Sequence, residues 1–201
     1  MSLRYLALGD SYTIGEDVPA DQRWPIQLTE KLRARAVAID DPQIVAVTGW
    51  TTDELSDGMD QAELGVGYDL VTLLIGVNNQ YRGRTAEEYR TQFRTLLMRT
   101  TTLAGKRPER VVVVSIPDWG VTPFGHKSDR DLRQIAAELD AFNAIAREEA
   151  LAAGGRFVNI TGISRDHASL VASDGLHPSG AQYALWTDAI EPTVADVLEQ
   201  R

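Results

Sequence analysis

Val111-Val112-Val113-Val114 is a run of four β-branched apolar residues, and it decides the fold class of this 201-residue chain. β-Branched residues favour strands. A strand that is apolar at every position, rather than at every second one, is buried on both faces. Strands of this kind belong to parallel sheets that helices cover on both sides. The run therefore predicts a central strand of an α/β protein.

Working outward from this run, short β-rich segments alternate with longer helical patterns. The predicted strands cover residues 4–8, 43–47, 70–75, 110–116 and 156–160. Between them, apolar residues recur at helical spacing and predict helices that bury one face. They are Tyr89, Phe93, Leu96 and Leu97 in one segment and Leu132, Ile135, Ala136, Leu139, Phe142 and Ala146 in another. Three helix starts show the capping-box pattern: Thr51-x-x-Glu54, Thr85-x-x-Glu88 and Ser179-x-x-Gln182.

This alternation predicts an α/β fold with one parallel sheet, covered on both faces and linked by right-handed crossovers. With 43% hydrophobic residues the chain can form one well-buried core. No repeat, low-complexity tract or linker divides it, so we expect a single domain over residues 1–201.

The polar residues that follow the predicted strands come together at one edge of such a sheet. Ser11, Gly49 and Asn78 each follow a strand, and Asp174 and His177 lie in the loop beyond the fifth. Open α/β sheets bind ligands beyond the carboxyl ends of their strands. The topology alone therefore predicts a site formed by these residues.

Their chemistry is that of a serine hydrolase, which needs an activated hydroxyl, a base, a group that orients the base and donors for the oxyanion. Ser11 is the candidate nucleophile, His177 the base, Asp174 the orienting carboxylate and Asn78 an oxyanion donor. Each also has a simpler reading as a helix cap, a surface histidine or a turn residue. Their joint presence favours catalysis.

The segments Gly9-Asp10-Ser11, Gly76-Val77-Asn78-Asn79 and Asp174-Gly175-Leu176-His177 resemble the motifs of the SGNH hydrolases, also called the GDSL esterase/lipase family. The resemblance implies a Ser11, Asp174 and His177 triad. It also implies an oxyanion hole built from the backbone N–H groups of Ser11 and Gly49 and the side chain of Asn78.

The same resemblance implies a flavodoxin-like three-layer α/β/α sandwich whose five parallel strands follow the order 2-1-3-4-5. One position departs from the family pattern, because the third motif usually ends in Asp and here ends in Asn79. An amide has nearly the shape of a carboxylate, so we expect Asn79 to hydrogen-bond within its turn. Asp10 is expected to hold the turn before Ser11.

Aromatic residues on the same loops are candidates for an apolar substrate pocket, or for simple packing: Trp50, Tyr81, Trp119 and Phe124. Arg82 and Arg84 could bind an anionic substrate or be solvated loop charges. His126 and His167, with Asp118, Asp129 and Asp166, lack metal-ligand spacing, so no metal is expected. The serine mechanism requires no cofactor.

The composition of the chain indicates which classes of binding partner and which cellular location to expect. A formal net charge of −9 disfavours nucleic acid. The sequence has no run apolar enough for a membrane span, and its first apolar stretch, residues 5–8, is too short for the core of a signal peptide. We therefore expect a cytoplasmic protein. The absence of cysteine excludes disulfides and thiol catalysis.

The sequence thus predicts a serine esterase or acylhydrolase that cleaves small carboxylic esters, with short acyl chains, through an acyl-enzyme. The alternative is a catalytically inactive flavodoxin-like module that binds a ligand. Oligomeric state cannot be predicted from these patterns.

Overall fold

Five parallel strands form one sheet in the computed structural model of the protein, which describes residues 2–199. The strands are β1 (Tyr5–Gly9), β2 (Gln43–Ala46), β3 (Leu70–Leu74), β4 (Val111–Val114) and β5 (Arg156–Val158). Their order is β2-β1-β3-β4-β5, and every neighbouring pair is parallel. The predicted strand number, direction and order are confirmed.

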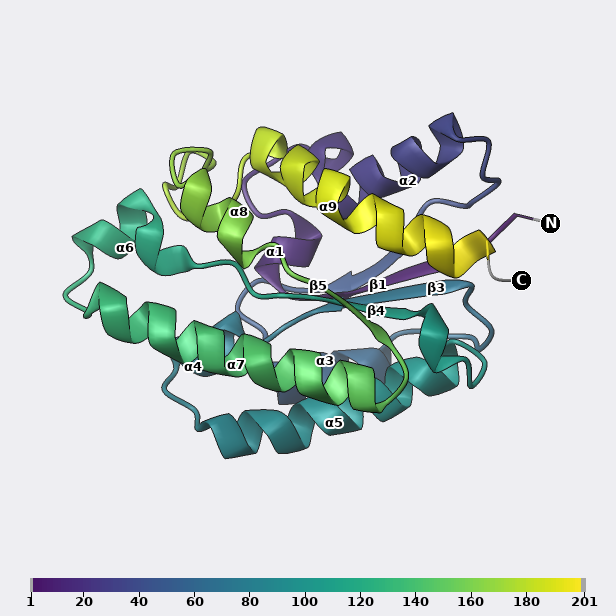
Figure 1. The fold of residues 1–201 in the computed structure, drawn as a ribbon, viewed down its shortest axis with the longest axis horizontal. Coiled ribbons are helices and arrows are strands. Elements are labelled where there is room, and N and C mark those ends of the chain that lie inside the picture. The colour runs from purple at the N-terminus through teal and green to yellow at the C-terminus, as the bar shows by residue number, and fades with distance from the viewer. Residues whose placement is uncertain (1, 200–201) are drawn as a thin grey trace.

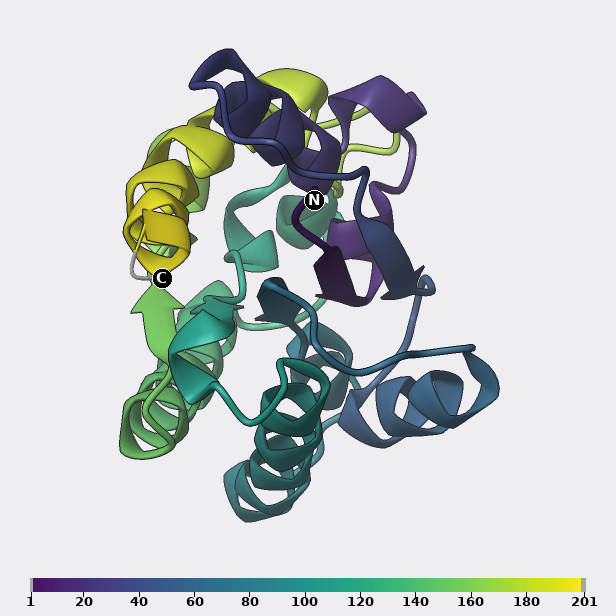
Figure 2. The same cartoon turned by 90° about the vertical axis from the view of Figure 1, so that its right-hand side faces the viewer.

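Helices cover both faces of this sheet (Figure 1). They are α1 (Ser11–Ile14), α2 (Trp24–Ala34), α3 (Thr52–Gln61), α4 (Val77–Tyr81), α5 (Ala86–Leu103), α6 (Pro123–Lys127), α7 (Leu132–Ala152), α8 (Thr161–Asp166) and α9 (Gly180–Glu199). Helices α2 and α9 pack together on one face, and α5 and α7 pack together on the other, beside α3 (Figure 2). The three-layer sandwich follows from strands that are apolar on both faces.

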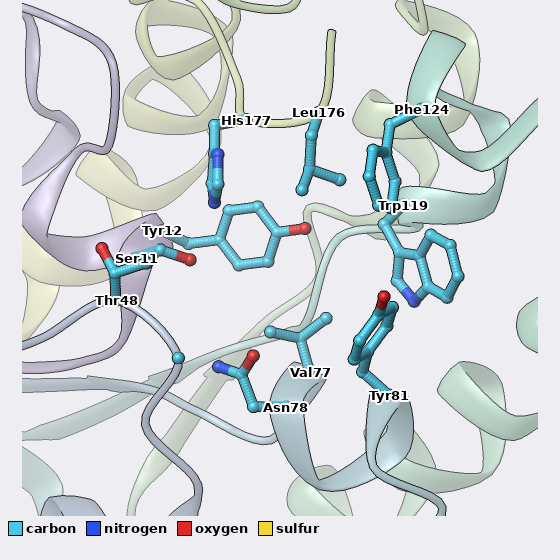
Figure 3. A pocket seen from close by; sticks show the side chains of 11 residues that line it. Ser11, Tyr12, Thr48, Val77, Asn78, Tyr81, Trp119, Phe124, Leu176 and His177 are labelled. Atoms are coloured by element: carbon cyan, nitrogen blue, oxygen red, sulfur yellow. The ribbon is translucent and has the colours of Figure 1, made fainter. Parts of the chain in front are cut away.

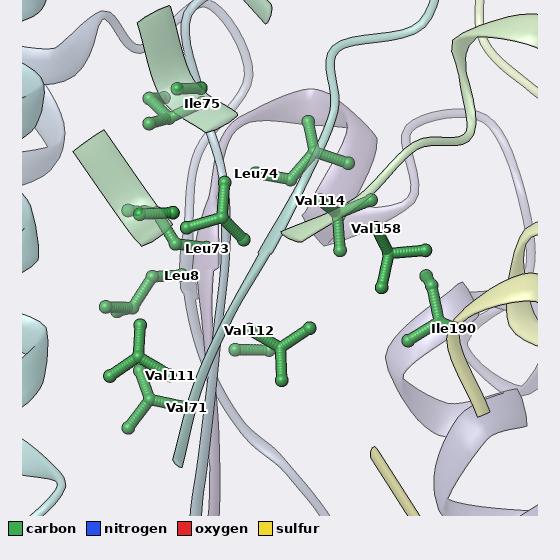
Figure 4. Close-up of a cluster of buried hydrophobic side chains, with 14 of the residues drawn as sticks. Leu8, Val71, Leu73, Leu74, Ile75, Val111, Val112, Val114, Val158 and Ile190 are labelled. Atoms are coloured by element: carbon green, nitrogen blue, oxygen red, sulfur yellow. The ribbon is translucent and has the colours of Figure 1, made fainter. Parts of the chain in front are cut away.

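The valine run is buried as its sequence predicts. All four residues of β4 are at most 2% exposed. Val111 and Val112 point to opposite faces of the sheet, and Ile190 of α9 lies on the side of Val112 (Figure 4). Full burial of one such side chain stabilises the fold by about 1.5–3 kcal/mol. The buried side chains of both layers form one continuous core.

One of the three predicted helix starts has the complete capping box, and the other two have half of it. Both halves of the capping box are present at α3, where the Thr51 backbone N–H donates to Glu54 Oε2 at 2.9 Å. At α5 only one half forms: Thr85 Oγ1 accepts from the backbone N–H of Glu88 at 3.1 Å, while the Glu88 carboxylate accepts from the side chains of Arg84 and Gln92 instead.

The third start, at α9, also has only half of its capping box. The Gln182 backbone N–H lies 3.4 Å from Ser179 Oγ. The Gln182 amide does not reach back to the cap, because its Nε2 donates to the carbonyls of His167 and Leu170 at 3.0 and 3.1 Å. This side chain therefore fastens the preceding loop to α9 instead of closing the helix end.

No helix within residues 2–199 is both long and apolar enough to cross a membrane. Residues that follow each of the five strands come together at one edge of the sheet, as the topology predicts.

Candidate active site

Ser11 is the first residue of α1, directly after β1, and only 4% of it is exposed. The turn before it needs glycine, because a Cβ on Gly9 would lie 2.2 Å from Thr13 Oγ1 and 2.5 Å from the Leu74 carbonyl. Asp10 caps the helix by accepting the Tyr12 backbone N–H at 3.0 Å. The predicted structural role of Asp10 is confirmed, and together the two residues fix the place of Ser11.

Asp10 is also fully buried, and its second oxygen, Oδ2, has no hydrogen-bond partner among the described residues. Burial raises the pKa of Asp10 to about 7, although the bond from the Tyr12 N–H acts in the opposite direction. The residue beside the candidate nucleophile is therefore a carboxyl group that titrates near neutral pH.

The Asp174–His177 loop is held tightly by its own hydrogen bonds. Asp174 Oδ1 accepts from the backbone N–H groups of Leu176 and His177 at 2.8 and 2.9 Å, and Oδ2 lies 2.5 Å from His177 Nδ1. Partial burial acts to raise the pKa of Asp174, but the bonds from the His177 ring and the two N–H groups outweigh it and hold the pKa below its ordinary value. The carboxylate is thus charged and fixed against the imidazole.

Asp17 ties this loop to the segment that follows α1. Its Oδ2 accepts from Ser173 Oγ at 2.5 Å and from the Asp174 backbone N–H at 3.1 Å. Asp17 has a left-handed backbone, with φ of 60°, a conformation that Asp tolerates better than most residues. The segments that carry Ser11 and His177 are thereby connected directly.

The candidate oxyanion donors come from two further loops. Asn78 lies in α4, and its Nδ2 donates one hydrogen bond to the Trp50 carbonyl at 2.9 Å, which leaves its second N–H for another acceptor. Gly49 has φ of 87°, a backbone conformation that favours glycine. The backbone N–H groups of Ser11 and Gly49 make no hydrogen bond within residues 2–199.

Asn79 lies next to Asn78 but outside the site. It is fully buried, and its side chain accepts from the Thr52 backbone N–H at 3.1 Å and donates to Thr52 Oγ1 at 2.7 Å. It therefore joins α4 to the start of α3. The expectation that Asn79 bonds within its own turn is wrong. The reason is that the Thr52 backbone N–H, which has no partner within α3 because it lies in the first turn, is within reach of Asn79.

One pocket of about 240 Å³ brings the candidate residues together (Figure 3). Ser11, Gly49, Asn78 and His177 all line it. The remaining lining residues are Tyr12, Thr48, Val77, Tyr81, Trp119, Phe124 and Leu176. Asp174 is not among them, because it lies behind His177 and contacts Nδ1 of the ring.

An aromatic wall, formed by Tyr81, Trp119 and Phe124, bounds this pocket. The Tyr81 and Phe124 rings lie 5.4 and 6.1 Å from the Trp119 ring, centroid to centroid. Trp119 is held from behind, since its Nε1 donates to Gln80 Oε1 at 2.9 Å and Gln80 Nε2 donates to Glu138 Oε2 at 2.6 Å. This part of the pocket is therefore a fixed surface.

Trp50 does not line the pocket. Its ring lies against Gly58 of α3, where an added Cβ would lie 2.2 Å from the indole. Only the backbone carbonyl of Trp50 contributes to the site, because it accepts a hydrogen bond from Asn78 and so positions that side chain. The ring turns away because Gly58 leaves space for it in the helix layer.

The arginines predicted to bind an anion or to be solvated are paired with carboxylates. Arg82 contacts Glu54 at 3.1 Å, and Arg84 contacts Asp53 at 2.8 Å. Asp118 caps a turn and bonds to Arg165 at 2.9 Å. Over residues 2–199, no group of three or more His, Asp or Glu side chains is arranged to hold a metal ion.

Comparison with known families identifies the chain. The profile of the GDSL-like lipase/acylhydrolase family matches residues 7–185, which include every candidate residue above. The chain belongs to this family. The resemblance seen in its motifs is confirmed, and the protein is a carboxylic ester hydrolase.

Solved structures share the fold of this GDSL-like protein over nearly their whole length. TesA has a TM-score of 0.74 at 16% identity, with 97% of this chain and 99% of TesA covered. The lipase/acylhydrolase from Enterococcus faecalis has a TM-score of 0.74 at 19% identity, with coverage of 98% and 96%. A catalytic mutant of Axe2, an acetylxylan esterase from Geobacillus stearothermophilus, has a TM-score of 0.73 at 16% identity, with coverage of 96% and 95%. A search of curated protein sequences gives no match.

Five residues of this GDSL-like site had no role assigned from the sequence: the pocket-lining residues Tyr12, Thr48, Val77 and Leu176, and Asp17. Tyr12 directly follows the candidate nucleophile, which places its backbone near the site, but the sequence does not give the direction of its side chain. Asp17 carries no local signal, since only the tertiary fold brings it to Ser173.

Proposed function

We propose that this GDSL-like hydrolase cleaves carboxylic esters through a Ser11, His177 and Asp174 triad. Ser11 Oγ attacks the ester carbonyl while His177 takes its proton, and the tetrahedral intermediate collapses as His177 returns that proton to the leaving alcohol. Water, activated in turn by His177, then releases the acid from the acyl-enzyme. Asp174 fixes the imidazole and stabilises its cation.

The observation that carries this proposal is the convergence of Ser11, Asn78 and His177 in one pocket, with Asp174 Oδ2 at 2.5 Å from the imidazole. Ser11 Oγ makes no hydrogen bond to His177 within the described residues. Catalytic hydrogen bonds often tighten only when substrate binds, so this arrangement is compatible with the proposed role.

The negative charge of the intermediate would be stabilised by three donors. The backbone N–H groups of Ser11 and Gly49 have no partner in the described part of the chain, and Asn78 Nδ2 has one N–H left. Donors that are already in place stabilise a developing oxyanion without reorganisation, which is the largest single contribution in many enzymes of this type.

The size of the pocket supports a preference for short acyl chains. Its 240 Å³ lie below the range of about 300–1,000 Å³ that is typical of sites for drug-sized ligands. The fixed Trp119 ring bounds it. A panel of p-nitrophenyl esters should show faster turnover of acetate and butyrate than of long-chain esters, and Trp119→Ala should move the optimum to longer chains. A wild-type preference for long chains would contradict this part of the proposal.

The hydrolysis of p-nitrophenyl acetate and butyrate by the wild type and by Ser11→Ala tests the mechanism. We expect a rate that depends on Ser11. The same pair of proteins should be treated with a fluorophosphonate probe, which labels only an activated serine. Labelling of the wild type but not of the variant supports the triad. If neither hydrolysis nor labelling depends on Ser11, the inactive binding module becomes the better interpretation.

A further inference from the structure

Tyr12 places a phenol hydroxyl in the pocket. The residue is only 3% exposed, yet it lines the cavity together with Ser11 and His177. Its ring centroid lies 5.7 Å from that of His177. From there the ring extends across the pocket, and the hydroxyl points away from Ser11 toward the side formed by Leu176, Phe124 and Trp119 (Figure 3).

This hydroxyl has no hydrogen-bond partner within residues 2–199, unlike the hydroxyls of two other buried tyrosines, Tyr5 and Tyr89. The Tyr5 hydroxyl lies 3.0 Å from Thr72 Oγ1, and the Tyr89 hydroxyl donates to the Ile75 carbonyl at 3.1 Å. The Tyr183 hydroxyl also lacks a partner, but it is enclosed by protein atoms and does not line the pocket. The Tyr12 hydroxyl, in contrast, is not enclosed by protein atoms and faces the pocket, so it is available to a ligand. A ligand that covered it without offering a polar atom would leave it unpaired, which costs free energy.

Apart from the candidate catalytic and oxyanion groups, the other polar side chains of the pocket are already engaged or lie at its exposed rim. Trp119 Nε1 is bonded to Gln80. Thr48 is exposed and donates to Glu16, and Tyr81 is 50% exposed. On the side away from Ser11, the Tyr12 hydroxyl is therefore a donor that faces the cavity among mainly apolar and aromatic neighbours.

The hydroxyl keeps its proton. Burial raises the pKa of Tyr12 well above its ordinary value, and the nearby carboxylates of Asp10, Asp118 and Asp174 act in the same direction. A neutral phenol donates one hydrogen bond, and the best partner for it is an oxygen acceptor.

We propose that the Tyr12 hydroxyl is a substrate-binding donor, and that it selects esters with an ether or hydroxyl oxygen in the group that fills the pocket. The proposal rests on the function proposed above and specifies its substrate class. An apolar chain of the same length would leave the hydroxyl unpaired. A site built to bond a substrate oxygen discriminates against the analogue that lacks it.

The first arm of the test places the oxygen in the acyl group. p-Nitrophenyl methoxyacetate and p-nitrophenyl butyrate have the same length and differ by an oxygen in place of a methylene. Their ratio of kcat/KM is measured for the wild type and for Tyr12→Phe. Dividing one ratio by the other cancels the intrinsic reactivity of the two esters. We expect the preference for the methoxy ester to fall about three- to tenfold in Tyr12→Phe, as expected for the loss of one hydrogen bond.

The second arm places the oxygen in the alcohol, with 2-methoxyethyl acetate against butyl acetate. A shift in either arm supports the proposal and shows which part of the ester fills the pocket. Equal effects of Tyr12→Phe on both members of both pairs would overturn it. If the wild type hydrolysed none of the four esters faster than Ser11→Ala does, the proposed function itself would be contradicted.

Tyr5→Phe is the matched control, because it removes a buried hydroxyl that does not line the pocket. It should leave both substrate ratios at their wild-type values, whatever it does to stability. Melting temperatures of the two variants show whether Tyr12→Phe is folded at the assay temperature. An equal shift of the substrate ratios in Tyr5→Phe would overturn the assignment to Tyr12.

Discussion

At the scale of single residues, Asn78 illustrates how one side chain can be both held and available. The Trp50 carbonyl accepts a hydrogen bond from one of the two N–H groups of the Asn78 amide, so the amide is oriented before substrate binds. Asn78→Ala should lower kcat by on the order of 10²–10³ with little change in KM, because the lost interaction belongs to the transition state. Steady-state kinetics on p-nitrophenyl butyrate would measure this.

Asn79→Asp is the control for this prediction, because Asn79 is the neighbouring residue and lies outside the pocket. A carboxylate would still accept the Thr52 N–H at the start of α3, where negative charge is favourable. This variant should stay within a few-fold of the wild-type rate. If Asn78→Ala turned over as fast as the wild type, Asn78 would not be an oxyanion donor.

Because burial raises the pKa of Asp10, the free energy of unfolding should depend on pH. Its folded pKa of about 7 is above that of an unfolded Asp, so the folded state binds a proton that the unfolded state has released. Stability from this group is fully present below the unfolded pKa of about 4, and it is lost as the pH rises toward about 7.

We therefore expect the stability of the wild type, relative to Asp10→Asn, to fall by on the order of a few kcal/mol between about pH 4 and pH 8. Asparagine keeps an acceptor for the Tyr12 N–H and carries no charge. Urea unfolding of both proteins across this pH range measures the difference. Parallel pH profiles for the two proteins would show that Asp10 does not carry the effect.

At the scale of elements, the site depends on contacts between loops that are far apart in the sequence. Asp17, after α1, accepts two hydrogen bonds from the loop before α9. Asp17→Ala should lower kcat/KM about three- to tenfold, since the loop that carries His177 loses ordering bonds of roughly 1 kcal/mol each.

Asp17→Asn tests whether hydrogen bonding is the cause. Its side-chain oxygen can accept from the same two donors, and asparagine also tolerates a left-handed backbone. It should restore most of the kcat/KM lost in Asp17→Ala. Ser173→Ala removes one of the two bonds, so its kcat/KM should lie between those of the wild type and Asp17→Ala. An Asn variant as impaired as the Ala variant would point to the charge instead.

Elements whose signal is local were predictable, and those that depend on tertiary partners were not. The strand predicted over residues 110–116 ends at Val114. Beyond it, side chains replace backbone groups as partners: the Ser115 hydroxyl accepts from the Ile160 backbone N–H at 2.8 Å, and the Ile116 N–H donates to Asn143 Oδ1 at 2.7 Å. The capping box at α3 was read correctly from four residues. At α9 the same pattern gives only half of the box, because the Gln182 side chain donates to carbonyls in the preceding loop.

At the scale of the whole molecule, parallel topology explains why the site could be anticipated. Ser11, Gly49, Asn78 and His177 were expected to converge because their loops share one sheet edge, and all four line one pocket. The direction of a side chain does not follow from topology. Trp50 lies at the right edge, but its ring packs against Gly58.

The charge of the whole molecule leads to a last prediction. With a net charge of −9, and with Arg82 and Arg84 paired to carboxylates, the protein should repel anionic esters. Raising the ionic strength from about 20 mM to about 300 mM shortens the Debye length to well under the size of the protein. The kcat/KM for mono-p-nitrophenyl succinate should therefore rise about two- to fivefold, while that for neutral p-nitrophenyl butyrate stays nearly constant. A fall with salt would instead mean that a local cation attracts the carboxylate. Arg130, whose guanidinium lies 5.3 Å from the centre of the Trp119 ring, would then be the residue to replace.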